Sequence, residues 1–432
     1  MSARRYLLPG LGAALVAIEL AALSFQRADR LCALLVAILA QGAVYFVAAY
    51  AVTRWGGRLG PILAVAAILR LLLLLAPPYL SDDVYRYVWD GKVQAAGVNP
   101  YRYVPAAPEL APLRDDAIYP RINRRGSAVT IYPPAAQAFF LATTRVSGSV
   151  TWMKVSMVAW EALAVGLLLV LLRRAGRPEP WVLLYAWHPL PVWEFAGNGH
   201  LDAAAIAWIL VALLARERGR TGLAGVALGL ATLTKLYPLA LLPALWRPGD
   251  RRLPLALGAT VAVGYLPYLG AGAGVLGYLP GYLDEEGLRS GARYWLLQVA
   301  EALGHHPSPA AYLVPVGLAL LALSAWIALR RRPRQDHAGA ALLLASAAVV
   351  AFSPHYAWYV AWLLPLAAPR ADVPALLLGV TAFLLYLEGP ETRAWIGAAL
   401  YVPFLLLVAL RAWAQRPGSP SENAHVRPEA VP

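Results

Sequence analysis

Long apolar runs recur along the whole sequence and decide the environment in which this chain folds. The chain has 432 residues, of which 60% are hydrophobic and only 14% are charged. Its apolar residues are gathered into runs of roughly 15–22, the length that a helix needs to cross a bilayer. We therefore predict an all-α integral membrane protein that crosses the membrane many times.

Clusters of basic residues between the apolar runs predict how the chain is oriented. A formal net charge of +13 can indicate nucleic-acid binding. Here, however, the arginines lie in short clusters at the ends of apolar runs, as is typical of cytoplasmic loops, so we expect no nucleic-acid partner. The main clusters contain Arg4 and Arg5, Arg54 and Arg58, Arg173 to Arg177, Arg216 to Arg220, and Arg330 to Arg334.

Together, the run lengths and the basic clusters predict about 12 full crossings plus one broken hairpin. The hairpin lies between Gly222 and Trp246, with basic residues at both ends and with Lys235 and Pro238 at its apex. Both chain termini then lie in the cytoplasm, which makes this a multi-pass protein of the plasma (inner) membrane. The single cysteine, Cys32, lies inside an apolar run, so no disulfide framework is expected.

Residues 1–415 are expected to form one membrane domain. Its two long outer loops, residues 78–151 and 270–310, carry polar and aromatic residues that suit short helices at the membrane interface. We expect such helices at Val84 to Ala96, from about Tyr132 to Val146, and at Gly291 to Leu303. Residues 416–432 are rich in proline, serine and charge, which predicts a disordered cytoplasmic tail.

Two adjacent acids stand where the chain leaves the membrane after its third apolar run. The stretch from Ser81 to Gly91 follows the apolar run from Ile62 to Ala76 and begins with Asp82 and Asp83. A carboxylate near hydrocarbon is costly unless it is solvated or partnered, so this pair is a candidate functional site. The alternative is a solvated loop in which Asp82 caps a following helix.

Four further polar residues also lie at the ends of apolar runs, and the predicted topology places all of them on the outer side. They are His200, Asp202, Lys235 and His355. We expect them to share one cavity with the two acids. Each has a simpler alternative: His200 and Asp202 can form a turn with a helix cap, while Lys235 can extend to a lipid headgroup. His355 can belong to a belt of aromatic and polar residues at the interface.

These residue types suit a transfer of sugar from a lipid donor. Carboxylates offer a general base, lysine and arginine bind phosphate, and aromatic rings cover sugar faces. The outer side of a bacterial-type membrane has no nucleotide pool, so a donor there has to be carried in the lipid, as a polyprenyl-phosphate sugar is. No phosphate-cradling glycine motif, paired metal-ligand spacing or nucleophile elbow is present. Nothing demands a metal or a cofactor, although Asp82 and Asp83 can bind a cation.

An ordered set of motifs resembles the bacterial mannosyltransferase-like members of the GT-C superfamily, of glycosyltransferase family 87 type. The matching motifs cover the chain well from about the third apolar run to the hairpin. In the C-terminal third, only Ser353-Pro354-His355-Tyr356 matches. The earlier motifs are Asp82-Asp83, Tyr85 to Gly91, Asn99-Pro100-Tyr101, Tyr132-Pro133-Pro134, Gly199-His200-Leu201-Asp202 and Lys235-Leu236-Tyr237-Pro238.

This resemblance implies an all-α membrane glycosyltransferase. Such an enzyme transfers a hexose, with mannose favoured, from a polyprenyl-phosphate donor to a cell-envelope glycan or lipid acceptor on the outer face of the membrane. The configuration at the anomeric carbon is inverted. The expected partners are the lipid donor, the acceptor and the membrane lipids, and no cofactor is implied.

The resemblance also implies roles for single residues. The acidic pair holds the catalytic base, with Asp82 favoured and Asp83 second. Lys235 and one of Arg86 or His355 stabilise the departing phosphate, where charge grows in the transition state. The residues expected to bind substrate are His200, Asp202, Tyr85, Trp89 and Tyr356.

Two other functions remain open from the sequence. The broken hairpin at Lys235 is also compatible with a proton-coupled secondary transporter, in which a discontinuous helix and acids couple to protons. The lack of an internal repeat and the position of the acids in an outer loop count against it. A flippase or ligase for lipid-linked glycans shares the outer-facing site.

Overall fold

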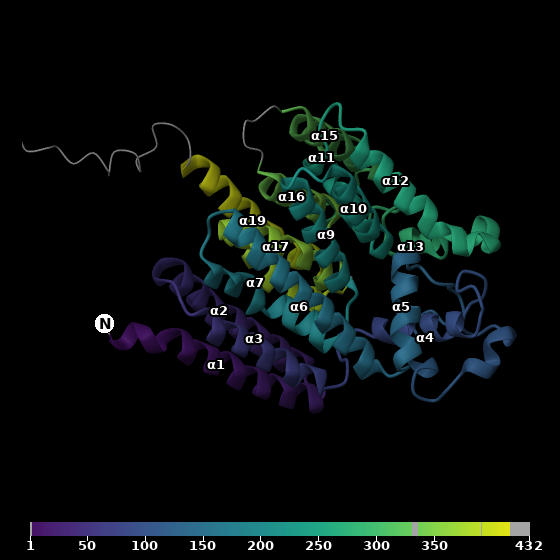
Figure 1. Cartoon of the computed structure of the whole chain (residues 1–432), viewed down its shortest axis with the longest axis horizontal. Helices are drawn as coiled ribbons and strands as arrows, with labels where there is room; N and C mark the ends of the chain where they lie inside the picture. Colours follow the sequence, from purple (N-terminus) through teal and green to yellow (C-terminus); the bar gives the residue numbers. More distant parts are fainter. Residues whose placement is uncertain (1, 331–335, 390, 415–432) are drawn as a thin grey trace, which may run out of the picture.

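Helices and connecting loops make up the whole described part of the chain, with no strand among those residues (Figure 1). The computed structural model describes residues 2–330, 336–389 and 391–414. The all-α prediction is confirmed for this part of the chain. The expected tail at 416–432 and most of the basic cluster at 330–334 lie outside the described residues.

Three long helices at the N-terminus lie side by side along one flank of the molecule (Figure 1). They are α1 (Ser2–Arg27), α2 (Leu31–Trp55) and α3 (Leu59–Leu74). Their bounds lie near the crossings that run length predicts at about Tyr6 to Ser24, Leu31 to Val52 and Leu59 to Pro77. The acidic stretch therefore begins a few residues after the C-terminal end of α3.

The polar connection after α3 is folded rather than extended, and it lies at the opposite end of the bundle from the start of α1 (Figure 1). It contains α4 (Asp83–Ala95), the 3₁₀ turns η1 (Pro108–Leu113) and η2 (Tyr119–Arg121), and α5 (Pro134–Val146). Helix α4 packs on α5. Both helices were predicted from the sequence at nearly these bounds.

The rest of the bundle alternates long helices with short helical pieces. The elements are α6 (Val150–Arg174), η3 (Glu179–Val182), α7 (Leu183–Ala186), α8 (Pro189–Pro191), η4 (Val192–Gly197), α9 (Asp202–Glu217), α10 (Thr221–Thr234), η5 (Tyr237–Leu241), α11 (Leu242–Leu245), α12 (Arg252–Tyr265), η6 (Leu266–Leu276), α13 (Leu279–Glu285), α14 (Trp295–Ala302), α15 (Pro309–Leu329), α16 (His337–Phe352), η7 (Ala357–Leu363), α17 (Leu364–Ala367), η8 (Ala368–Arg370), α18 (Val373–Thr381), η9 (Ala382–Leu387) and α19 (Arg393–Ala414).

Six helical segments of the described chain are long and apolar enough to cross a membrane, and four shorter apolar helices accompany them. The six are Tyr6–Arg27, Leu31–Trp55, Val150–Arg174, Arg252–Glu285, Pro309–Leu329 and Arg393–Ala414. These helices fit an integral membrane protein. The number of about 12 crossings stays a prediction, because several expected spans are short or broken.

The apolar run from Trp181 to Ala196 predicts one membrane-spanning helix, but the structure has four short pieces there, η3, α7, α8 and η4. Prolines at 180, 189 and 191 lack the N–H group that a continuous helix needs. Irregular backbone at membrane depth is tolerated only where protein covers it. Every residue from Val182 to Ala207 is buried, so this broken segment forms the centre of the bundle.

The hairpin predicted between Gly222 and Trp246 is confirmed in its main feature, a break at the expected residues. Helix α10 ends at Thr234, and η5 begins at Tyr237. Lys235 itself is extended, with φ −144° and ψ 147°. Its side chain is thereby directed away from the helix axis at the apex of the hairpin.

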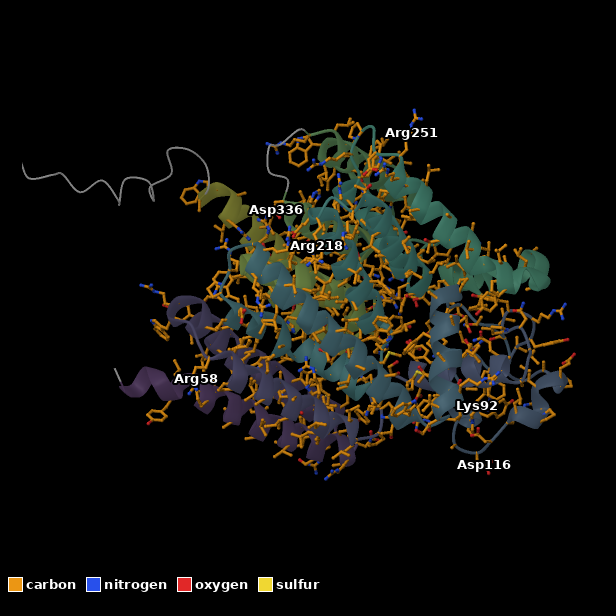
Figure 2. All side chains as sticks on the ribbon, in the orientation of Figure 1. Arg58, Lys92, Asp116, Arg218, Arg251 and Asp336 are labelled. Carbon is orange, nitrogen blue, oxygen red and sulfur yellow. The ribbon has the colours of Figure 1, made fainter. Side chains whose placement is uncertain are left out.

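Charged loops separate to two ends of the molecule (Figure 2). Arg58, Arg218, Arg251 and Asp336 lie toward the left and top of the view, whereas Lys92 and Asp116 lie at its lower right. The acid-bearing connection therefore lies apart from these four residues, and the orientation of the chain in the membrane stays a prediction.

Candidate active site

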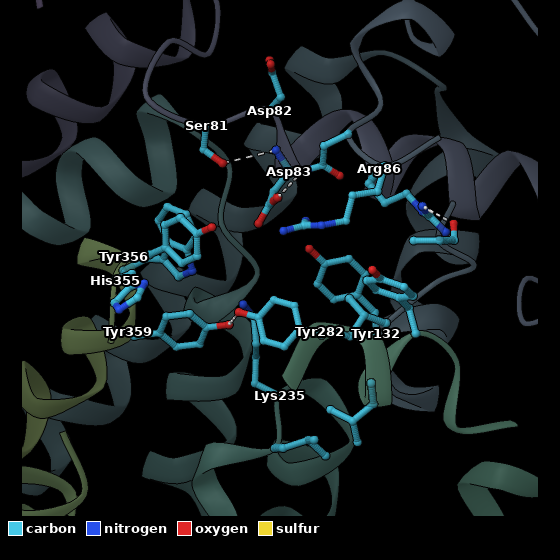
Figure 3. A pocket seen from close by; sticks show the side chains of 18 of the residues that line it. Ser81, Asp82, Asp83, Arg86, Tyr132, Lys235, Tyr282, His355, Tyr356 and Tyr359 are labelled. Atoms are coloured by element: carbon cyan, nitrogen blue, oxygen red, sulfur yellow. Dashed lines mark hydrogen bonds between the residues drawn. The ribbon is translucent and has the colours of Figure 1, made fainter. Parts of the chain in front are cut away.

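A cavity of about 890 Å³ lies between α4, α13 and the break that follows α10 (Figure 3). Its walls come from parts of the chain that are distant in sequence. Polar residues in the walls include Asp82, Asp83, Arg86, Asn123, Arg124, Lys235, His355, Tyr356, Glu388 and Arg393. Six of the residues singled out from the sequence as site residues therefore meet in one place: Asp82, Asp83, Arg86, Lys235, His355 and Tyr356.

The two adjacent acids have different environments. Asp82 is half-exposed, pairs with Arg121 at 2.6 Å, and points away from the cavity centre in Figure 3. Asp83 points into the cavity, and its Oδ1 accepts a hydrogen bond from Asn123 at 3.1 Å. Asp82 precedes α4, but its side chain makes no capping hydrogen bond. Asp83 is thus the acid that faces the cavity, whereas the family resemblance favoured Asp82 as the base.

Helix α4 sorts its side chains onto two faces. Asp83 and Arg86 are three residues apart, so they share a face, and both line the cavity. Tyr85 and Trp89 lie on another face. Arg121 covers the ring of Tyr85 at 4.5 Å from its centroid, and Trp89 packs against Tyr119. Tyr85 and Trp89 are therefore not among the residues that line the cavity, and their contact with substrate stays a prediction.

Arg86 is held by a buried polar cluster behind the cavity wall. Its Nε donates to Asp90 at 2.8 Å, and its Nη1 donates to the carbonyl of Ala128 at 3.1 Å. The other oxygen of Asp90 accepts from Thr130 and Gln137. Both oxygens of Asp90 are thus hydrogen-bonded, so this carboxylate holds the Arg86 guanidinium in one orientation, which favours binding of an anion.

Lys235 lies at the cavity wall with a buried carboxylate behind it. Its Nζ is 3.2 Å from Asp202 Oδ2, and the other oxygen of Asp202 accepts from Tyr237 at 3.0 Å. The ammonium also lies over the rings of Tyr132 and Tyr359. Its position in a protein cavity differs from that of a lysine that extends to lipid headgroups.

His200 and Asp202 do not line the cavity. Both side chains are fully buried, one behind Asp83 and the other behind Lys235. Their side chains lie inward, next to residues that form the wall, so the structure does not bring them to the cavity surface, and their contact with substrate stays a prediction.

His355 lies in the cavity wall between cations. Burial, with added repulsion from Arg293 and Arg393, lowers its pKa to about 4, so the ring is neutral near pH 7. Its Nε2 is 3.8 Å from Glu388, and Arg393 donates to the same Glu388 oxygen at 2.7 Å. His355 can therefore offer a hydrogen bond but no positive charge.

Aromatic rings form much of the remaining wall. Tyr356 stacks on Trp358 with ring centroids 4.5 Å apart, and the hydroxyls of Tyr282 and Tyr359 are 2.9 Å apart (Figure 3). Burial raises the pKa of Tyr356 to about 12. These rings are neutral and rigid, which suits contact with a sugar face.

Several cavity residues were not singled out from the sequence. Asn123 bonds Asp83, and Arg124 forms an ion pair with Glu285 that joins the loop before α5 to α13. Arg124 has a positive φ of 51°, which is uncommon for a residue with a side chain. Nothing in the local pattern distinguishes these residues from other loop residues, because their importance comes from contacts across the chain.

The described residues contain no group of three or more His, Cys, Asp or Glu side chains arranged to hold a metal ion. Asp82 and Asp83 point in different directions, so the pair does not form a joint ligand set (Figure 3).

A comparison with known protein families gives one match. The family model for glycosyltransferase family 87 matches residues 130–354, more than half of the chain. The match includes the hairpin with Lys235 and ends just before His355, while the acids of α4 precede it. No curated protein and no solved structure matches the chain. The chain therefore belongs to glycosyltransferase family 87, whose members are polytopic membrane glycosyltransferases of the GT-C type.

Proposed function

We propose that this glycosyltransferase moves a hexose, with mannose favoured, from a polyprenyl-phosphate donor to a glycan or lipid acceptor of the cell envelope. The observation that carries this proposal is that one carboxylate, Asp83, and two cations, Arg86 and Lys235, line the same cavity. A carboxylate can take a proton from a hydroxyl, and cations bind a phosphate. Family membership favours such a transfer over a proton-coupled transporter.

The two cations serve the departing phosphate. Arg86 and Lys235 are each held by a buried carboxylate, so their charges are in place before a donor binds. An ammonium has three N–H groups, and Lys235 can therefore bond Asp202 and a phosphate oxygen together. Preorganised positive charge stabilises the negative charge that grows on the phosphate as it leaves.

Asp83 serves as the general base of a single displacement. It takes the proton of an acceptor hydroxyl, and the hydroxyl oxygen forms a bond to the anomeric carbon of the donor sugar. The bond from that carbon to the phosphate oxygen breaks, and polyprenyl phosphate leaves with the electron pair. Attack from the opposite face inverts the anomeric configuration. This displacement needs no cofactor.

The aromatic walls hold the sugar. Tyr356 is fixed by its stack on Trp358, while Tyr282 and Tyr359 face the cavity from α13 and η7 (Figure 3). Apolar sugar faces pack on such rings, and their hydroxyls can bond sugar hydroxyls.

The proposed setting is the outer face of the plasma (inner) membrane, with both termini in the cytoplasm. One observation supports it: Asp83 and Arg86, which line the cavity, belong to the same helix as Lys92, and Lys92 lies away from Arg58, Arg218 and Arg251 in Figure 2.

A transfer assay tests the proposal. Membranes that contain the protein are given radiolabelled polyprenyl-phosphate mannose, polyprenyl-phosphate glucose or a nucleotide-linked mannose. Label is expected to enter membrane glycans from a polyprenyl-phosphate donor and not from the nucleotide sugar. Transfer from the nucleotide sugar alone, or no transfer from any donor, contradicts the proposal.

A double variant tests the donor-phosphate site. Lys235→Met alone strands the buried Asp202 charge, which is destabilising by roughly 3–5 kcal/mol. Lys235→Met combined with Asp202→Asn removes both charges, so we expect normal protein levels, a donor KM raised roughly 10–100-fold and a lower kcat, because the lost charge also stabilises the leaving phosphate. The matched control replaces the buried pair Arg70 and Glu161 by methionine and glutamine, which lies away from the cavity lining and should leave the donor KM unchanged.

A further inference from the structure

A short segment that begins at the end of η2 contacts both acids at the start of α4, and the proposed transfer assigns it no role. Arg121 donates to Asp82 Oδ1 at 2.6 Å, and the side-chain amide of Asn123 donates to Asp83 Oδ1 at 3.1 Å. The first contact is an exposed ion pair, whereas the second involves a neutral amide that lines the cavity. One segment therefore holds the two acids by partners of different kinds.

The residues on either side of Asn123 anchor this segment. Ile122 is buried in the hydrophobic core. Arg124 forms an ion pair with Glu285 of α13, and its carbonyl accepts hydrogen bonds from two backbone N–H groups of the following turn, at 3.1 and 2.9 Å. The backbone of Asn123 is therefore fixed from both sides, which limits where its side chain can reach.

The backbone directly after Asn123 is strained. Arg124 has φ 51°, in the left-handed region that residues with a side chain rarely adopt. Strain of this kind persists only where the surrounding structure imposes it, and it is concentrated at functional sites. Here the bend lets two adjacent side chains reach different elements, with Asn123 on Asp83 of α4 and Arg124 on Glu285 of α13.

The two oxygens of Asp83 differ in their partners. Oδ1 is bonded by Asn123, whereas Oδ2 accepts no hydrogen bond from the residues that the structure describes. His200 Nδ1 lies 3.9 Å from Oδ2, beyond hydrogen-bond distance. The torsion that rotates a carboxylate about its Cβ–Cγ bond is soft, so a hydrogen bond at one oxygen decides where the other one points. The amide of Asn123 is therefore the contact that sets the orientation of Oδ2.

We propose that Asn123 is the positioning residue of the base: its amide holds Oδ1 of Asp83 and leaves Oδ2 to take the proton of the acceptor hydroxyl, an inference that rests on the proposed function. As that proton moves to Oδ2, the hydroxyl oxygen bonds to the anomeric carbon and polyprenyl phosphate leaves with the electron pair. Asp83 later releases the proton to water. Asn123 itself neither gains nor loses a proton.

Two physical reasons favour an amide in this position. A general base has to lie within roughly 2.6–3.2 Å of the proton donor, and small misplacements of reacting groups are costly to the rate. An amide N–H can also bond a carboxylate without taking its proton, and a hydrogen bond donated to a carboxylate favours the charged form that acts as a base. Asp82 then serves the segment through Arg121 and not the acceptor.

The first test needs no substrate. A water-soluble carbodiimide modifies protonated carboxyl groups, and peptide fragmentation by mass spectrometry separates Asp82 from Asp83 in the purified full-length protein. Asn123→Leu keeps the shape of the side chain but has no N–H. We expect the pH at which half of Asp83 is modified to rise by roughly one unit. Asp82 keeps its pair with Arg121, so its half-modification pH should stay unchanged.

Other charged and titratable groups act on Asp83 from several elements, and the substitution leaves all of them in place. Besides Tyr87 on α4, they are Arg124 and Tyr132 before α5, Glu194 in η4, His200 before α9, Lys235 after α10, Tyr356 before η7 and Tyr386 in η9. A shift confined to Asp83 therefore reports the lost amide.

The matched control is Arg125→Gln in the same segment. Arg125 bonds the carbonyl of Pro120 at 2.9 Å, so its loss loosens the segment but should leave the modification curves of both acids in place. Asn123→Ala is the second variant, should Asn123→Leu fail to fold. Its shift should have the same direction but be smaller, because water can replace the amide. An unmoved Asp83 curve in the folded variants, or equal shifts of the two acids, overturns the inference.

The second test uses transfer from labelled polyprenyl-phosphate mannose. Asn123→Leu is expected to lower kcat roughly 10–100-fold with the donor KM unchanged, and to move the acid limb of the kcat–pH profile upward by the same amount as the modification curve. In an Asp83→Asn background it should cause no further loss. A further loss there, or a raised donor KM, shows that Asn123 acts on the substrate or the fold and overturns the inference. Wild-type protein that transfers no sugar contradicts the proposed function instead, independently of the carbodiimide result.

Discussion

Adjacent residues of the same type can have opposite roles when a helix begins between them. Asp82 precedes α4 and turns toward Arg121 at the surface, whereas Asp83 begins α4 and faces the cavity. Exposed ion pairs contribute little to stability, commonly below about 1 kcal/mol. The two acids therefore differ in accessibility to a substrate and also in what their loss should cost.

Conservative substitutions distinguish the roles of Asp82 and Asp83. Asp83→Asn keeps the shape and one acceptor oxygen but cannot take a proton from the acceptor, so turnover should fall roughly 10²–10⁴-fold with donor binding little changed. Asp82→Asn should stay within about threefold of wild type, because it loses only an exposed ion pair. Initial rates at equal protein levels give both values. Near wild-type turnover in Asp83→Asn removes it as the base.

His355 predicts a pH dependence of stability. Its pKa in the folded protein is about 4, below the ordinary value of 6.5, so between these values the unfolded chain binds more protons. The stabilising contribution is thus complete above pH 6.5 and is lost as the pH falls toward 4, by at most about 3 kcal/mol. The melting temperature of the purified protein should fall between pH 6.5 and pH 4, and it should fall less in His355→Gln. An equal fall of the melting temperature in both proteins contradicts the lowered pKa of His355.

At the scale of elements, α13 lines the cavity together with α4, and two residues, Gly277 and Tyr278, join α13 to η6. Gly277 has φ +60°, a conformation that residues with a side chain rarely adopt. A Cβ there also collides with the carbonyl oxygen of Thr130, the same oxygen that accepts a hydrogen bond from Tyr278 at 3.0 Å. This junction therefore fixes α13 against the loop that holds Arg86.

Gly277→Ala should displace α13 and lower both stability and turnover. The strained backbone and the collision together should cost roughly 1–3 kcal/mol. The melting temperature and kcat of the purified protein measure both effects. Gly270→Ala is the matched control in the same connection, since nothing lies within 4 Å of its added Cβ. Two variants with the same melting temperature contradict this view of the junction.

At the scale of the whole molecule, a broken, fully buried segment forms the centre, and long apolar helices surround it. The buried segment from Val182 to Ala207 contains Glu194, His200 and Asp202. It places His200 next to Asp83 and Asp202 next to Lys235, on the protein side of the cavity wall. A continuous helix cannot supply three such side chains at one level, because its turns separate them along the axis. The prolines that break this segment are therefore part of how the site is built.

The orientation of the molecule in the membrane has a direct test. Reporters fused after Gly91, Asp202 or His355 are expected to be extracytoplasmic, and reporters fused after Arg218 or Arg334 cytoplasmic. An enzyme active only in the cytoplasm and one active only outside it, fused at the same positions, should give opposite patterns. A cytoplasmic signal after Gly91 contradicts the outer-facing site.

The sequence by itself determined the local features of this protein. Run length and hydrophobicity predicted helices, since a chain in hydrocarbon has to satisfy its hydrogen bonds internally. Proline and lysine chemistry located the break at Lys235, and helical spacing is enough to place Asp83 with Arg86 on one face of α4. These features depend on neighbours within a few residues, which a single sequence contains.

Only the tertiary structure decided which polar residues form the wall and which lie behind it. His200, Asp202 and Lys235 all stand at the ends of apolar runs, yet only Lys235 lines the cavity. Glu194 gave no signal, because it lies within an apolar segment and acquires its partners from Tyr386, distant in sequence, and from Asn198. Burial and pairing of this kind are set by contacts between remote segments, and local pattern carries no information about them.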